Sequence, residues 1–111
     1  DQDLLRRGAS MTVEFMVEIG AVPFYLSIVE GRLVSLERGP ALMRSWRFAI
    51  RGTVEAWTRF WQPVPEPGWH DIFALTKRQE ARVEGDLRPF MTHLQYIKDL
   101  LAVPRRVFKE G

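Results

Sequence analysis

The sequence predicts an α+β domain in which a five-stranded, mostly antiparallel sheet carries helices on one face. Three observations lead to this fold class. Apolar and polar residues alternate over residues 11–19, which is the period of a half-buried strand. The turns at residues 20–23 and 30–32 are too short for a parallel return, so they must join antiparallel neighbours. After Gly85 and Asp86, apolar residues recur at helical spacing, and such a helix has to pack on the sheet.

The alternating pattern of the first segment returns in the segments that follow. In the fourth segment Trp46, Phe48 and Ile50 occupy every second position, so Arg47 and Arg51 are expected on the opposite face. Gly and Pro residues separate the segments and mark the turns between them. The predicted strands cover residues 11–19, 23–30, 32–37, 45–51 and 80–85.

Helix start and stop signals place three helices after the fourth strand. Thr53 is a suitable N-cap for the first helix, which must end before Pro63 because proline disfavours helix at the preceding residue. Gly85 is expected to have a positive φ or a close backbone neighbour at the last strand-to-helix corner, and Asp86 to cap the final helix, which Pro104 ends. The predicted helices cover residues 53–62, 69–78 and 87–102.

Length and composition indicate one globular domain. The chain has 111 residues, of which 46% are hydrophobic, and this is enough for a modest core. We predict a polar lead at residues 1–10, which is either a frayed end or the tail of a missing segment, a single domain at 11–103, and a C-terminal tail at 104–111.

The charge pattern gives no sign of a nucleic-acid partner. The net charge is only +2, and the basic residues are spread along the chain in pairs at most. There are no cysteines and no apolar run long enough for a membrane span, so we expect neither disulfides nor stable membrane insertion, and a cytoplasmic location.

Two sequence blocks resemble the sterol carrier protein-2 family. The first is Phe48 to Thr53, which ends a strand before two short helices, and the second is Arg82 to Leu87, which opens a terminal amphipathic helix. The Glu30-Gly31 turn also matches the acidic-Gly turn of that family. The resemblance covers roughly residues 11–102. It implies a sheet covered by helices, with an apolar cavity between the layers that takes a fatty-acyl or sterol-like ligand without catalysis.

The large apolar side chains of the predicted helices are the candidate binding residues. Their combined volume is larger than short helices need in order to pack on a sheet, although the same residues can form an ordinary core. We expect the cavity wall to include residues from the inward stripes of all three helices, among them Phe60, Phe73, Met91 and Leu94. The predicted ligand-binding residues are Trp57, Phe60, Trp61, Ile72, Phe73, Phe90, Met91, Leu94 and Ile97.

Two alternatives to a lipid carrier stay open. One is a small α+β enzyme resembling the nuclear-transport-factor-like hydratases, with His70 or Asp71 as the base, although the order of helices and strands argues against it. The other is an interaction or regulatory module of a larger protein, whose apolar surface would meet a partner protein or a second copy. We expect no metal ion, because no metal-ligand spacing of His or acidic residues occurs, and no cofactor.

Overall fold

The computed structural model describes residues 11–40 and 44–104. The lead at 1–10 lies outside the described residues, as does the predicted tail apart from Pro104. No helix in the described part of the chain is long and apolar enough to cross a membrane. In chain order the elements are β1 (Val13–Ile19), β2 (Val22–Val29), β3 (Arg32–Arg38), β4 (Phe48–Gly52), α2 (Val54–Phe60), α3 (Ile72–Lys77), β5 (Ala81–Gly85), α4 (Leu87–Thr92) and α5 (Leu94–Leu101).

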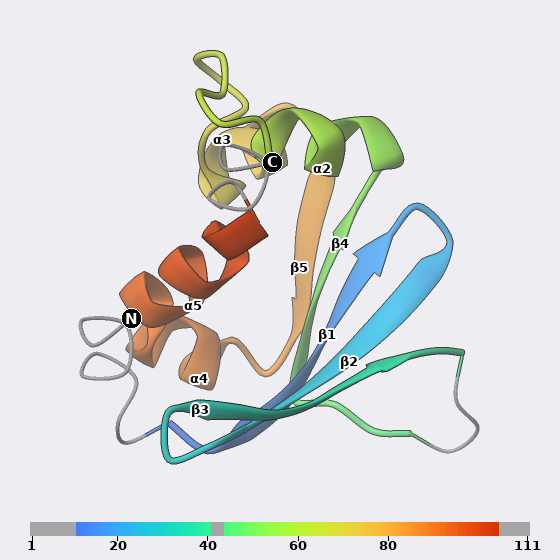
Figure 1. The fold of residues 1–111 in the computed structure, drawn as a ribbon, viewed down its shortest axis with the longest axis vertical. Coiled ribbons are helices and arrows are strands. Elements are labelled where there is room, and N and C mark those ends of the chain that lie inside the picture. The colour runs from blue at the N-terminus through green and yellow to red at the C-terminus, as the bar shows by residue number, and fades with distance from the viewer. Residues whose placement is uncertain (1–10, 41–43, 105–111) are drawn as a thin grey trace.

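Strand β1 lies at the centre of the sheet, whose strand order is β3-β2-β1-β4-β5 (Figure 1). It pairs antiparallel with β2 and parallel with β4, and the pairs β2–β3 and β4–β5 are antiparallel. The predicted five-stranded, mostly antiparallel sheet is therefore confirmed.

The helices gather on one face of the sheet, as predicted (Figure 1). At the centre of this helix-side face, Phe15 and Phe48 are 0% exposed and lie opposite each other in β1 and β4. Their rings stack with centroids 4.8 Å apart. The helical layer buries them with a set of large apolar side chains, among them Trp57, Phe60, Ile72, Leu75, Phe90 and Ile97.

The opposite, outer face of the sheet carries ion pairs and a small apolar cluster. The prediction that Trp46 lies on the helix-side face is wrong, because its ring lies with Arg51, whose guanidinium carbon is 5.7 Å from the ring centroid. The alternation fails there because the strand begins only at Phe48, after a bend at Arg47. On this face Trp46 packs against Met16, Tyr25 and Ala49.

The helix start signals read from the sequence are confirmed. The Thr53 hydroxyl accepts a hydrogen bond from the Ala56 N–H at 3.0 Å, and the Asp86 carboxylate accepts one from the Arg88 N–H at 3.1 Å. Gly85 has a φ of +97°, and a Cβ there would come within 2.6 Å of the Arg47 carbonyl oxygen. Only glycine fits this corner without displacing the backbone of the neighbouring strand.

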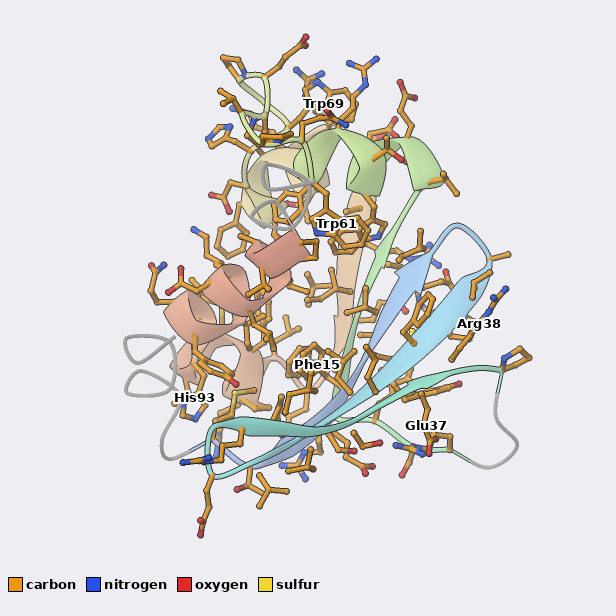
Figure 2. The ribbon with its side chains drawn as sticks, viewed as in Figure 1. Phe15, Glu37, Arg38, Trp61, Trp69 and His93 are labelled. Carbon is orange, nitrogen blue, oxygen red and sulfur yellow. The ribbon has the colours of Figure 1, made fainter. Side chains whose placement is uncertain are left out.

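Two helix boundaries differ from the prediction. The second helix begins at Ile72 rather than at residue 69, because Asp71 has extended backbone angles and Trp69 belongs to a preceding turn. The predicted helix at 87–102 is two helices, α4 and α5, which meet at His93 (Figure 2). The backbone of His93, with φ −114° and ψ 30°, leaves the helical region and changes the direction of the chain.

Candidate functional site

An apolar pocket of about 350 Å³ lies between the β1–β3 side of the sheet and the end of the helical layer. All of its lining residues are apolar, so the pocket offers no side-chain charge to a ligand. The sheet and the end of α5 both contribute to the wall. The apolar pocket is lined by Val17, Ile19, Phe24, Leu26, Leu33, Leu36, Trp61, Leu100, Leu101, Val103 and Pro104.

The sheet side of the apolar pocket is built by strand alternation and by one irregularity in β3. Leu33 lies opposite Ile28, and Leu36 lies opposite Leu26, so both leucines face the helix side although they are three positions apart. The register shift between Ser27 and Ile28 makes this possible, because an extra residue in one strand offsets the two-residue period. The leucines are 43% and 59% exposed, which places them at the mouth of the pocket.

Trp61 forms the part of the wall that comes from the first helix. Its indole N–H donates a hydrogen bond to the Leu101 carbonyl oxygen at 2.8 Å, and its ring stacks on Trp57 with centroids 4.9 Å apart. Trp61 therefore joins the end of α2 to the end of α5 (Figure 2). The hydrogen bond also satisfies a carbonyl at the C-terminus of α5, where intrahelical partners run out.

Tyr96 fixes α5 over the sheet from the other end. Its hydroxyl donates to the Gly31 carbonyl oxygen at 2.9 Å, in the turn between β2 and β3. Burial raises the pKa of the Tyr96 hydroxyl above its ordinary value, so the group stays protonated and keeps its role as donor. Together, Tyr96 and Trp61 hold α5 in the position that shapes the pocket.

Of the predicted ligand-binding residues, Trp61 lines the apolar pocket. Leu94 is half-buried against the core. Ring contacts tie several of the others together: the centroids of Trp57 and Phe60 are 5.6 Å apart, and those of Phe48 and Phe90 are 5.5 Å apart. Those that lie within the core, at most 2% exposed, are Trp57, Phe60, Ile72, Phe90 and Ile97.

The inward orientation predicted for Phe73 and Met91 is wrong. Phe73 is 41% exposed and Met91 is 55% exposed. Met91 follows the buried Phe90 by one position, about 100° around the helix, so only one of the two can face the sheet. Phe73 keeps an edge contact with the Phe90 ring, at a centroid distance of 6.2 Å, and the Lys98 ammonium lies 5.6 Å from the centroid of the Phe73 ring.

The strand residues of the pocket wall are absent from the sequence-based prediction, which places the wall on the helices. Alternation puts Phe24 and Leu26 on one face of a strand, but nothing in it distinguishes a residue beside a pocket from one beneath a helix. The signal that was available is the run Leu100 to Pro104, in which apolar residues continue past the end of the amphipathic stripe. An apolar segment of this kind is stable only against an apolar neighbour beyond the end of the helix.

A second, polar pocket of about 240 Å³ collects the residues of the enzyme alternative. Asp71 and His70 both line it, together with Lys98 and Asp99. The Asp71 carboxylate is 3.2 Å from the Lys98 ammonium, and the His70 Nδ1 accepts a hydrogen bond from the Gly68 N–H at 3.2 Å. This ion pair ties α5 to the start of α3.

A network of ion pairs lies on the outer face of the sheet, away from the apolar pocket. Arg51 donates to the carboxylates of Glu84 and of Glu18, the latter at 2.8 Å. The hydrogen bond from Arg51 lowers the pKa of Glu84 and, in return, the bond to Glu84 raises the pKa of Arg51. These three strands, β1, β4 and β5, are thus linked by charge on the side that the helices leave open.

The described residues contain no group of three or more His, Cys, Asp or Glu side chains placed to hold a metal ion. The apolar pocket likewise has no donor set for a cofactor that binds through charge. What this arrangement can do chemically is to remove apolar surface from water.

Comparison with known proteins adds fold-level relatives. No protein-family model matches the sequence, and no curated protein matches it. A crystal structure of sterol carrier protein 2 is similar at a TM-score of 0.72 and 14% identity, covering 95% of this chain and 84% of that one. A solution structure of a conserved hypothetical protein from Thermus thermophilus, which its description connects with sterol carrier proteins, is similar at a TM-score of 0.66 and 13% identity, covering 96% and 77%.

A third similar structure is a ubiquinone synthesis protein described as UbiJ-SCP2. It matches at a TM-score of 0.54 and 13% identity, covering 89% of this chain and 77% of that one. At these identities the likeness concerns the fold. The order of strands and helices and the long coverage agree with the resemblance read from the sequence, and the chain therefore has the fold of sterol carrier protein 2.

Proposed function

We propose that this protein is a non-catalytic binding module that holds a single-chain lipid or a similar apolar molecule in the apolar pocket. The observation that carries the proposal is the uniform lining: strands, helix ends and the Val103-Pro104 segment all present apolar side chains to one space of about 350 Å³. A volume of this order is within the range of ligand pockets, roughly 300–1,000 Å³.

The energetics favour a chain-like ligand. Each Å² of apolar surface that leaves water contributes about 25 cal/mol, and a pocket without polar groups imposes no desolvation cost of its own. The pocket is open at the β3 edge, where Leu33 and Leu36 remain exposed. A bound acyl chain would cover these leucines, so binding would remove apolar surface of both the chain and the leucines from water.

Fluorescent fatty-acid binding to the purified protein tests the proposal. Leu100→Trp fills the apolar pocket from α5 and should abolish binding of the probe while leaving the thermal midpoint nearly unchanged, because an open space accepts the added volume. Leu94→Trp is the matched control on the same helix, since Leu94 packs against the core and does not line this pocket. We expect Leu94→Trp to retain binding and to lose about 1–3 kcal/mol of stability by overpacking.

The same pair of variants distinguishes two positions for the ligand. If Leu94→Trp abolishes binding and Leu100→Trp does not, the ligand lies between the sheet and the helix layer, near Phe60 and Leu94, as the sequence suggested. Wild-type protein that binds no fatty-acid or sterol probe, and from which no lipid is released on denaturation, would overturn the carrier function altogether.

A further inference from the structure

The five strands place a single charged side chain on the helix-side face of the sheet, and it is Arg38. The pairing registers show this directly. Arg38 lies opposite Phe24, which lies opposite Val17, and the same row continues through Ile50 to Val83. In Figure 2, Arg38 and the adjacent Glu37 lie on opposite sides of β3. Arg38 thus occupies a position that is otherwise apolar across the whole sheet.

The row that contains Arg38 leads into the apolar pocket. Phe24 and Val17, its next two members, both line the pocket, and Leu36, two residues before Arg38 on the same face, lines its mouth. Arg38 itself is exposed at the edge strand. Its guanidinium is therefore placed where the polar end of a ligand would emerge from the pocket.

Arg38 also differs from three other arginines near the sheet. Arg44, Arg47 and Arg51 each form an ion pair with a carboxylate on a neighbouring element. Among the residues that the structure describes, no carboxylate lies within ion-pair distance of Arg38. A cation that lies beside an apolar wall, and that has no carboxylate partner in the described part of the chain, can bind an external anion.

We infer that the ligand is a long-chain carboxylic acid whose chain fills the apolar pocket and whose carboxylate binds the Arg38 guanidinium. This inference rests on the proposed function and specifies its ligand class. The planar guanidinium matches a carboxylate with two parallel hydrogen bonds, which a primary alcohol of the same chain length cannot form. Arg38 is then the residue that determines specificity for the acid, while the apolar wall supplies most of the affinity.

The test compares palmitate with hexadecanol, which share the chain and differ in the head group. Wild-type protein should bind palmitate about tenfold more tightly, since a hydrogen bond to a charged group contributes more than a neutral one. Arg38→Gln should remove this preference and leave the affinity for hexadecanol unchanged. Arg38→Lys should keep part of the preference, because it retains the charge without the planar fork.

Arg32→Gln is the matched control, because Arg32 lies on the same strand but opposite Val29, on the outer side. It should leave the preference for palmitate intact. Equal affinities of the wild-type protein for the two ligands, or an Arg38→Gln variant that loses both ligands to the same extent, would overturn the inference and leave the carrier function standing. Failure of both ligands to bind the wild-type protein would contradict the carrier function itself.

Discussion

Gly85 and Asp86 turn the last strand directly into the helices that complete the core. Gly85 supplies a backbone conformation that other residues rarely adopt, and it lets the corner approach the Arg47 carbonyl. Asp86 then caps the helix through the Arg88 N–H, and its own N–H donates to the Arg47 carbonyl oxygen at 2.7 Å. The corner could be predicted from sequence because both effects are local and each depends on a single residue type.

Asp86→Ala removes the cap and should lower the free energy of unfolding by about 1 kcal/mol. Asp86 also lies 3.5 Å from the Arg47 guanidinium, but both side chains are largely exposed, so this pair should contribute little. Asp86→Asn keeps a capping oxygen and removes the charge, which makes it the control. Urea denaturation of the three proteins separates the effects: an Asn variant as unstable as the Ala variant would assign the loss to the ion pair.

Glu84 makes the stability of the folded protein depend on pH. Its pKa is lowered below the ordinary value of 4.5 by the hydrogen bond from Arg51, so ionised Glu84 stabilises the folded state above that value. The contribution is lost as the pH falls through the lowered pKa of the folded protein. We expect Glu84→Gln to reduce the difference between the thermal midpoints at neutral pH and at pH about 3. Equal differences in wild type and variant would show that Glu84 does not carry this linkage.

At the scale of elements, the strands agree with the prediction within a few residues and the last helices do not. Strand alternation is set by the pleat and can be read residue by residue. The break at His93 cannot be read this way, because the apolar stripe of Phe90, Leu94 and Ile97 continues across it with helical spacing. The prediction for Trp46 is wrong for a related reason, since a bend at Arg47 moves it to the other face.

Trp61 connects two elements that are distant in sequence, and the connection can be tested without removing the wall of the pocket. Trp61→Phe keeps a ring against Trp57 but removes the N–H that binds the Leu101 carbonyl, and it should cost about 1 kcal/mol of stability. Fatty-acid affinity should change little, because the Phe ring still lines the pocket and the Tyr96 hydrogen bond still holds α5. Trp46→Phe is the control for the loss of an indole, because the Trp46 N–H has no hydrogen-bond partner among the described residues. A Trp61 variant no less stable than this control would contradict the link.

At the scale of the whole molecule, the fold was predictable and the pocket wall was not. Order and spacing of elements define the sheet and the layer that covers it, because each apolar face must be buried. The pocket arises beside the end of α5, where the apolar faces of the sheet and the helical layer move apart. The distance between the two layers depends on many residues together, so it cannot be predicted from any one of them. This is why Trp57 and Ile97 form solid core, whereas Phe24 and Leu36 line open space.

The parallel pairing of β1 with β4 has a consequence for how the chain is made. As the protein emerges during synthesis, β1, β2 and β3 can pair at once through their short turns. The other edge of β1, from Phe15 to Ile19, keeps its backbone groups unpaired until β4 arrives from much further along the chain. An apolar strand edge of this kind readily pairs with other chains. The nascent protein therefore exposes an edge that is prone to aggregate in the interval between the synthesis of β3 and that of β4.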